Sequence, residues 1–403
     1  MNIQAIQSHQ PDKPDNGCQF GFELGYRPAL DGLRAVGVLA VMLHHTQLLS
    51  GGFLGVDVFF VLSGFLITSL LLEEHARAGR VSLRGFYTRR ALRLLPALAP
   101  VVVVGGSATI AWSPDWDSIG FVLSVLFYVA NWALVAGHSH GLLVHTWSLA
   151  IEEQFYILWP VGLLLLLRVT RRRILLALLL AAAAPLAVAY RFWTVVPTAS
   201  DHLRLYVGLD THADPLLIGC TLGLFCHSAL FKRTRAAAIG WNVAGVVAVP
   251  VLVTLFLWSR FPIDYAFASV STWTALATAV LIAATLAPGS PFAWLLAQRP
   301  LTWIGKRSYA LYLWHYPVFF VAVPDWLDVP KADLLTVVAA WAIAFTLAAA
   351  SFRYIEAPAL RWKATLSASR APAALRREKA RLDSPSCSSR TSSKETDRTP
   401  VQT

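Results

Sequence analysis

Long apolar runs separated by short polar connectors make up most of this sequence. A helix needs about 20 mainly apolar residues to cross the hydrocarbon core of a bilayer. Ten runs reach that length or come close to it: residues 31–50, 53–72, 91–111, 151–168, 173–190, 214–231, 237–258, 271–287, 303–323 and 334–352. The pattern predicts an all-α fold, a polytopic membrane helical bundle of about ten transmembrane helices.

The charges of the connectors predict the side of the membrane on which each one lies. Arginine is concentrated at 73–93, 168–173 and 231–235, and connectors rich in Arg and Lys lie on the cytoplasmic side. An eleventh apolar segment, 118–136, would break the alternation of sides if it crossed. We therefore expect a re-entrant or interfacial segment there, and both termini in the cytoplasm.

The composition supports a membrane protein and argues against a nucleic-acid partner. The chain is 56% hydrophobic and 14% charged, and its mean hydropathy is +0.55, which is too apolar for a soluble globule. The net charge is +11, but ten basic and four acidic residues lie from position 361 onward. The four cysteines show no metal-binding spacing. We expect a disordered cytoplasmic tail (1–25), a transmembrane domain (26–361) and a disordered basic cytoplasmic tail (362–403).

The first apolar run, LDGLRAVGVLAVMLHH, contains an arginine near its start and two histidines at its end. Arg34 and His45 are eleven residues apart, which is ~16 Å along a helix and within about 20° of the same face. An ionisable group inside a span is costly and indicates a functional site. The alternatives are that Arg34 reaches the interface and that His45 makes an interhelical hydrogen bond.

Acidic residues enter two further spans. Asp57 follows the turn near residues 49–53 at about the same depth as His45 precedes it, so the carboxylate is expected beside the imidazole. Glu152 and Glu153 open the span 151–168 without a basic neighbour in sequence, and such carboxylates need a partner or a water-filled cavity. Aromatic residues beside them, such as Trp147, would form a membrane-interface belt or a sugar platform.

Basic residues mark the inner ends of two spans. Arg90 and Arg93 are spaced i, i+3 and share a helix face, and guanidinium groups bind phosphate through two parallel hydrogen bonds. Lys306 and Arg307 precede the ninth span, in which His315 lies at mid-membrane depth. The alternative for Arg90 and Arg93 is the ordinary excess of positive charge on the cytoplasmic side.

Together these stretches resemble the membrane-bound acyltransferase family three, whose members O-acylate extracytoplasmic carbohydrates and some natural products. The resemblance covers about residues 26–360. It rests on six motifs in the family's order: DGLRAVGVLAVMLHH with Arg-x10-His, GGFLGVDVFFVLSGFLI, FYTRRALRLLP with Arg-x-x-Arg, TWSLAIEEQFY, SYALYLWHYP and IEAP.

The resemblance implies acyl-CoA, foremost acetyl-CoA, as a co-substrate from the cytoplasm, with no permanently bound cofactor and no metal. It implies His45 as the catalytic residue. The groups expected to hold CoA are Arg34, Arg90, Arg93, Lys306, Arg307 and Tyr309. Where the family often has an Asp-Thr-Arg-like segment, this chain reads DTHAD, with His212 in place of the arginine. We expect His212, Trp147 and His315 to contact the acceptor.

The predicted activity is transfer of an acyl group to a hydroxyl of a carbohydrate, a lipid-linked glycan or a macrolide-type natural product. Either His45 deprotonates that hydroxyl, with Asp57 or Glu152 orienting the imidazole, or an acyl-histidine forms first. The rival hypothesis is a polytopic transporter of a small polar or anionic solute. A scaffold without chemistry would leave Arg34, His45, Asp57 and Glu152 unexplained. All these hypotheses place the chain in the cell (plasma or inner) membrane as a multi-pass protein.

Overall fold

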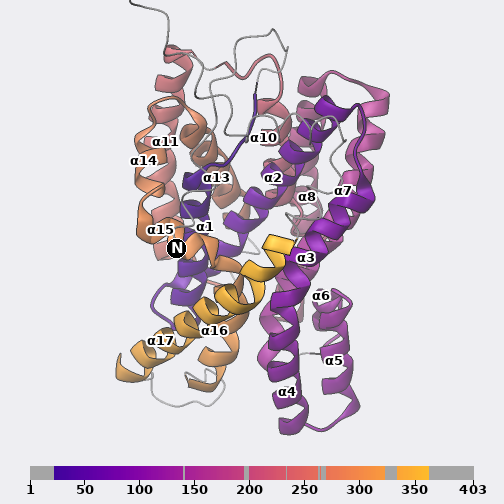
Figure 1. Ribbon diagram of the computed structural model, residues 1–403, viewed down its shortest axis with the longest axis vertical. Helices are drawn as coiled ribbons and strands as arrows, with labels where there is room; N and C mark the ends of the chain where they lie inside the picture. Colours follow the sequence, from indigo (N-terminus) through magenta and orange to yellow (C-terminus); the bar gives the residue numbers. More distant parts are fainter. Residues whose placement is uncertain are drawn as a thin grey trace, which may run out of the picture.

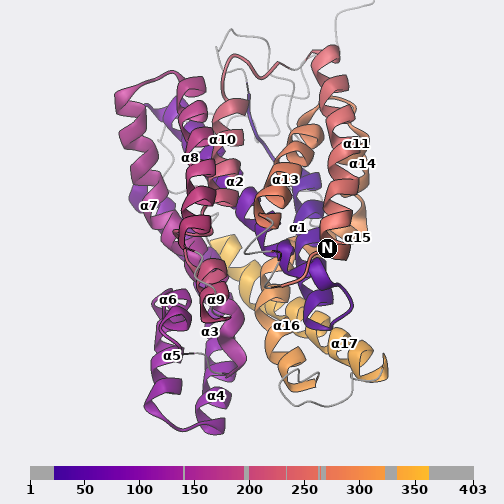
Figure 2. The same cartoon turned by 180° about the vertical axis from the view of Figure 1, so that it is seen from behind.

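The computed structural model describes residues 22–138, 141–194, 199–232, 234–261, 264, 269–322 and 334–362, and within these ranges the chain is helical without a strand (Figures 1 and 2). The predicted disordered tails fall outside these ranges except for residues 22–25 and 362. The first eight helices are α1 (Pro28–His45), α2 (Gly55–Ala78), α3 (Leu83–Val101), α4 (Ser107–Trp112), α5 (Trp116–Leu126), α6 (Ala130–Val135), α7 (Trp147–Val169) and α8 (Arg173–Thr194).

The second half of the chain is built in the same way. Its helices are α9 (Ala199–Val207), α10 (Asp214–Cys226), α11 (Arg235–Trp258), α13 (Val270–Leu286), α14 (Pro291–Leu296), α15 (Arg299–Lys306), α16 (Ser308–Ala322) and α17 (Leu334–Ser351). Turns of 3-10 helix precede α2 (Ser50–Leu54) and α7 (Gly141–Thr146). Turns of π-helix join α3 to α4 (Val102–Gly106) and follow α17 (Phe352–Glu356).

Six helical stretches of the described chain are long and apolar enough to cross a membrane: Ser50–Ala78, Leu83–Trp112, Gly141–Val169, Arg173–Trp193, Arg235–Trp258 and Leu334–Trp362. Shorter apolar helices cover other predicted spans, among them α10 and α13. Each of the ten predicted runs is helical over most of its length. The architecture is therefore that of a polytopic membrane helical bundle.

The eleventh apolar segment, 118–136, is divided between two short helices. Helix α5 has 11 residues and α6 has six, and Tyr128 between them has a positive φ of 54°. At 1.5 Å per residue, an 11-residue helix is only ~17 Å long, so neither piece alone spans a hydrocarbon core. The re-entrant or interfacial position of this segment stays a prediction.

Helix α2 lies at the centre of the bundle. In its apolar window, 78% of the residues are buried inside the protein, against 17% in α11, so α2 is an interior helix and α11 a peripheral one. Helix α10 packs along α2 through glycines: a Cβ at Gly64 would lie 2.2 Å from the carbonyl oxygen of Leu216, and one at Gly219 would lie 2.2 Å from that of Val61. Small residues allow such close backbone approach between membrane helices.

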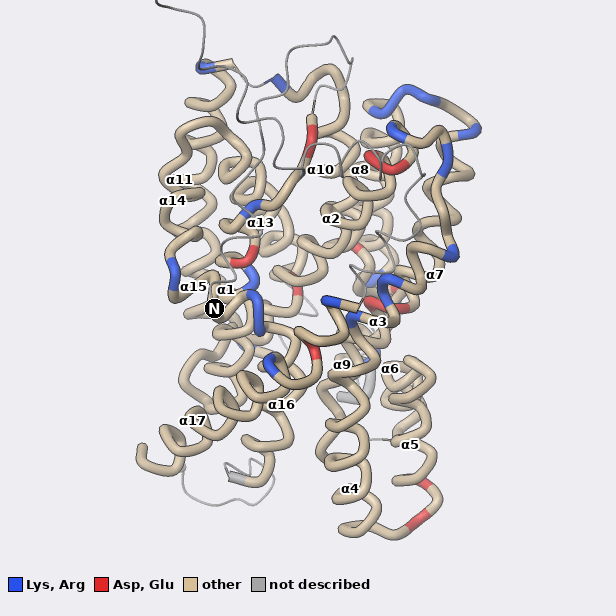
Figure 3. The backbone as a smooth tube through the Cα atoms, in the orientation of Figure 1, with Lys and Arg blue, Asp and Glu red and all other residues tan. Residues whose placement is uncertain are grey.

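Helices from distant parts of the chain surround this centre. Figures 1 and 2 show α11, α13 and α14 on one side of the upper half and α7 and α8 on the other, with α3 to α6 and α16 to α17 below. In Figure 3 the basic connection between α7 and α8 lies at the top and the acidic connection between α4 and α5 at the bottom. Basic and acidic segments also meet in the middle, around α1, α3 and α16.

Candidate active site

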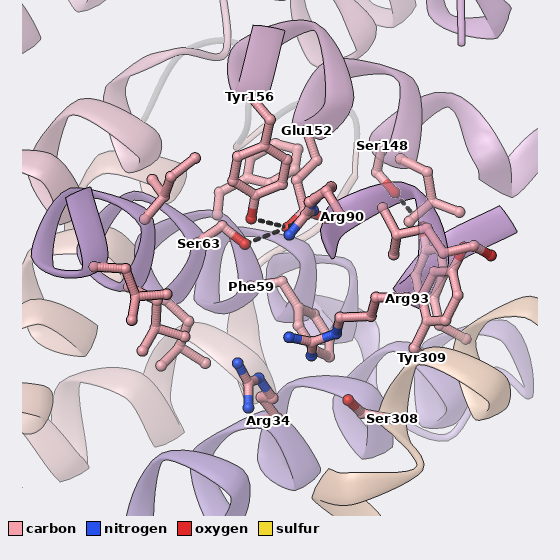
Figure 4. Close-up of a pocket in the computed structure, with 18 of the residues that line it drawn as sticks. Arg34, Phe59, Ser63, Arg90, Arg93, Ser148, Glu152, Tyr156, Ser308 and Tyr309 are labelled. Atoms are coloured by element: carbon pink, nitrogen blue, oxygen red, sulfur yellow. Dashed lines mark hydrogen bonds and ion pairs between the residues drawn. The ribbon is translucent and has the colours of Figure 1, made fainter. Parts of the chain in front are cut away.

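A cavity of about 300 Å³ opens between α1, α2, α3, α7 and α16. Its polar lining combines basic, acidic and hydroxyl side chains (Figure 4): Arg34, Ser63, Arg90, Arg93, Ser148, Glu152, Tyr156, Ser308, Tyr309 and Tyr312. Apolar residues of α2, such as Phe59 and Leu66, form much of the remaining wall. Five elements far apart in sequence thus supply one mixed polar and apolar pocket, the usual form of a small-molecule site.

Two arginines point into the same part of this cavity. Figure 4 shows that the guanidinium groups of Arg34 and Arg93 both lie in the space beside Phe59. Arg34 makes one ion pair, with Asp31 one helical turn before it, at 2.8 Å. Arg93 is exposed and makes no hydrogen bond or ion pair with the described residues. The two guanidiniums therefore have donors available for an anionic group.

Arg90 has a different environment, although it shares the i, i+3 spacing with Arg93. Its Nε donates to Glu153 Oε1 at 2.9 Å, and its Nη2 lies 2.8 Å from the same oxygen and 3.4 Å from Glu152 Oε1. Its guanidinium stacks on the ring of Tyr156, 3.3 Å from the centroid. Arg90 is thus the partner that the two carboxylates lacked in sequence, and its charge is largely neutralised within the protein.

Glu152 is held within the same network. Its Oε1 accepts hydrogen bonds from the hydroxyls of Ser63 and Tyr156, the latter at 2.5 Å (Figure 4). Its hydrogen-bond and ion-pair partners among the described residues all lie in the arginine-lined cavity, and Glu152 does not contact the imidazole of His45. The expectation that Glu152 orients this histidine therefore has no support in the geometry.

The wall of the cavity at Ser148 and Tyr312 separates it from a cluster of histidines. The two hydroxyls lie 2.5 Å apart, and Tyr312 Oη donates to the carbonyl oxygen of His145 at 2.9 Å. The Tyr312 ring also contacts the rings of His145 and His315, with centroids 5.6 and 5.4 Å apart. His45 is not among the residues that line the cavity, whereas Tyr312 contacts both the cavity and the histidine cluster.

The histidine cluster brings together the ends of α1 and of the turn before α7 with the middle of α16. The ring centroid of His45 lies 5.3 Å from that of His315 and 5.0 Å from that of Tyr316. His145 stacks on Tyr316 at 4.9 Å and meets His315 at 5.6 Å. His145 directly precedes the motif TWSLAIEEQFY and is not among the predicted site residues, because no spacing relates it to His45 or His315.

Asp57 lies elsewhere and does not pair with His45. Its Oδ1 lies 2.6 Å from His212 Nε2 and accepts a hydrogen bond from Ser271 at 2.6 Å. The 3-10 turn Ser50–Leu54 separates α1 from α2, and the carboxylate faces α13 and the loop after α9 instead. The expected pairing of Asp57 with His45 is therefore replaced by a fully buried Asp57–His212 pair.

His212 and Trp147 belong to this buried network and not to an open surface. His212 Nδ1 lies 2.6 Å from the carbonyl oxygen of Tyr206, and the Tyr206 ring packs against Trp147 with centroids 4.5 Å apart. Both predicted acceptor residues are buried. Of the three expected acceptor contacts, only His315 lies beside His45.

Of the predicted CoA-binding residues at the start of α16, Tyr309 lines the cavity and the two basic residues do not. Tyr309 lines the cavity and donates to the carbonyl oxygen of Leu94 at 3.2 Å. Lys306 lies over the Tyr26 ring at 5.4 Å, and Arg307 stacks between Trp303 and Phe352 at 4.0 and 4.7 Å. Neither Lys306 nor Arg307 is among the residues that line the cavity.

The fold and the site define a class: a multi-pass helical membrane protein whose arginine-lined cavity adjoins a buried histidine cluster. A family model described as an acyltransferase domain matches residues 27–353. The chain belongs to this acyltransferase family, as its motifs indicated.

Curated relatives of the chain include O-acetyltransferases of two bacterial species. It is 35% identical over 351 residues to the peptidoglycan O-acetyltransferase OatA of Listeria monocytogenes, covering 83% of this chain and 56% of that protein. It is 35% identical over 349 residues to the O-acetyltransferase OatA of Staphylococcus aureus, covering 83% and 57%. The chain thus spans little more than half the length of these relatives. No solved structure matches it.

Proposed function

We propose that the chain is an integral membrane O-acyltransferase that moves an acetyl group from cytoplasmic acetyl-CoA to a hydroxyl of a carbohydrate. The family and the names of the curated relatives support acetyl transfer, and the Listeria name supports a glycan acceptor such as peptidoglycan. The observation that carries the proposal is the arginine-lined cavity whose Tyr312 wall contacts the histidine cluster around His45.

The donor side is the arginine-lined cavity. CoA carries phosphates at one end and the thioester at the end of a long thin arm. Arg34 and Arg93 are positioned to bind phosphate through charge-assisted hydrogen bonds, while Arg90 holds Glu152 and Glu153 in place. The arm would lie along the α2 wall with the thioester directed toward Tyr312 and the histidines beyond it.

His45 acts as the base of the transfer. One ring nitrogen takes the proton of the acceptor hydroxyl while the oxygen forms a bond to the thioester carbonyl carbon. The C–S bond then breaks, and the departing CoA thiolate takes the proton from the imidazolium. Attack of His45 itself on the thioester would give an acyl-histidine first, and an acetylated enzyme trapped without acceptor would select that route.

The proposal includes the arrangement of the chain in the membrane. Ten spans with both termini in the cytoplasm place the arginine connectors inside, so that acetyl-CoA reaches the cavity from the cytoplasm. The acceptor hydroxyl reaches His45 from the other side, and only the acetyl group crosses. Acceptor choice lies between a surface or lipid-linked glycan and a glycosylated natural product, and the relatives favour the glycan.

The test compares His45→Ala with His44→Ala in membranes given labelled acetyl-CoA and glycan acceptors, followed by mass spectrometry of the products. Loss of a positioned base costs about 10²–10⁴-fold in rate, so His45→Ala should lose transfer. His44 has a backbone hydrogen bond through Nδ1 to the carbonyl oxygen of Leu49 at 3.3 Å, and its variant should retain most activity. Normal transfer by a folded His45→Ala protein would rule out the proposed mechanism.

A further inference from the structure

A histidine base works best when a partner fixes its tautomer, and in this protein the candidate carboxylates are occupied elsewhere. Asp57 is bonded to His212 and Ser271, and Glu152 lies among Ser63, Tyr156 and Arg90. The side-chain rings that contact His45 are those of His44, His315 and Tyr316. The partner of His45 must therefore come from this uncharged neighbourhood.

The protonation of His315 follows from its hydrogen bonds. Its Nδ1 lies 2.7 Å from the carbonyl oxygen of Tyr312 and 3.1 Å from that of Leu311. Carbonyl oxygens only accept hydrogen bonds, so Nδ1 carries the proton that is donated to them. In a neutral imidazole the other nitrogen is then an acceptor, and His315 Nε2 holds a lone pair.

That lone pair is buried and has no partner. His315 is fully buried, and its Nε2 makes no hydrogen bond with the described residues. A buried acceptor left unsatisfied costs about 1–3 kcal/mol, so the site favours any arrangement that brings a donor to it. Tyr312 does not supply one, because its hydroxyl proton is donated to the carbonyl oxygen of His145.

The His45 ring can supply that donor. Its centroid is 5.3 Å from that of His315, nearer than the 5.6 Å between the rings of His145 and His315. The terminal torsion of a histidine side chain has broad, roughly two-fold preferences, and rotation about it is the movement by which an N–H of His45 would turn toward His315 Nε2. A hydrogen bond in this direction leaves the opposite nitrogen of His45 unprotonated.

We propose that His315 is the positioning residue of the transfer: its Nε2 accepts the N–H of His45 and keeps the other His45 nitrogen free to take the acceptor proton. This inference rests on the proposed function and replaces the expected role of His315 in acceptor binding. When His45 becomes an imidazolium, the His315 lone pair stabilises the charge. A neutral partner also avoids the desolvation cost of an ionised carboxylate inside a membrane protein.

Two amide substitutions at this position separate the proposal from a packing role. The amide of glutamine reaches the depth of Nε2, whereas that of asparagine reaches only the depth of Nδ1. His315→Gln therefore keeps an acceptor near His45, and His315→Asn keeps only the backbone hydrogen bonds. His315→Leu removes both, and His44→Gln is the control on the neighbouring ring.

The experiment measures kcat and the KM for acetyl-CoA and for the glycan in purified protein, with size-exclusion elution as the folding check. We expect His315→Asn and His315→Leu to lower kcat about 10-fold or more, with both KM values within about two-fold, since positioning acts in the transition state. His315→Gln should recover most of the loss. Equal activity of the Gln and Asn variants, or a raised glycan KM at unchanged kcat, would overturn the assignment. Failure of the proposed function itself is distinct, because the unsubstituted protein would then transfer no acetyl group.

Discussion

Arg93 provides the sharpest test of the donor site, because it lines the cavity and makes no hydrogen bond or ion pair with the described residues. Arg93→Gln removes its charge from the cavity without breaking an ion pair or hydrogen bond of the described residues. Arg90→Gln, three residues away, instead removes the cation that Glu152 and Glu153 share. Removing one member of a partly buried ion pair leaves the other charge uncompensated, at a cost below the ~3–5 kcal/mol of a fully buried pair. We therefore expect Arg93→Gln to fold normally and Arg90→Gln to be destabilised.

The size of the effect on donor binding follows from the kind of contact. A hydrogen bond to a charged group contributes about 1.5–3 kcal/mol, and 1.4 kcal/mol corresponds to about ten-fold in affinity. Arg93→Gln should therefore raise the KM for acetyl-CoA about 10–100-fold. The kcat should change little, because the phosphate lies far from the reacting thioester and is bound equally in the ground and transition states.

The assay compares two donors in purified protein. Acetyl-CoA carries the phosphates, and S-acetylpantetheine carries the same thioester without them. If Arg93 binds a phosphate, the variant and the unsubstituted protein should use S-acetylpantetheine equally well, since the contact is already missing. Arg93→Lys should lie between the two, because lysine retains the charge but loses the planar fork. An unchanged KM for acetyl-CoA, or an equal loss with both donors, would refute a phosphate contact.

Two further predictions concern stability in detergent, measured as the thermal unfolding midpoint. Gly64→Ala should destabilise by about 1–3 kcal/mol, because the added Cβ would lie 2.2 Å from the carbonyl oxygen of Leu216 and force α2 from α10. The control is Gly240→Ala in α11, where no atom lies within 4 Å of the new Cβ; it should be neutral or stabilising by up to about 1 kcal/mol. Equal unfolding midpoints for the two alanine variants would contradict the close packing of α2 on α10. His212→Phe should cost about 3–5 kcal/mol by leaving the buried Asp57 without its basic partner, and Asp57→Asn should rescue part of that loss in the double variant.

The helical elements could be predicted from sequence because each depends on the length and hydropathy of its own segment. An apolar run in a bilayer must satisfy its own backbone hydrogen bonds, so it forms a helix wherever it is long enough. The break in the run 303–323 at Arg307 and the 13-residue length of α10 were not visible in hydropathy. Both depend on how neighbouring helices pack, since hydropathy averages over a window and does not register the end of a helix.

The candidate residues could also be recognised locally, but their partners could not. Arg34 and His45 lie on one helix as their spacing predicted. Arg90 and Arg93 differ by three residues, yet one is neutralised by Glu152 and Glu153 and the other is not. Partner choice depends on the rotation of each helix about its axis, and no single motif contains that rotation.

By itself, the sequence determined a membrane bundle, an acyltransferase resemblance and the chemical groups available to the reaction, because composition and motif spacing are properties of the chain alone. The tertiary structure decided that Asp57 pairs with His212, 155 residues away, and that His45 lies against His315 from α16. The reason is geometric: hydrogen bonds require contact within about 3 Å, and contacts between helices so distant in sequence are set by the packing of the whole bundle.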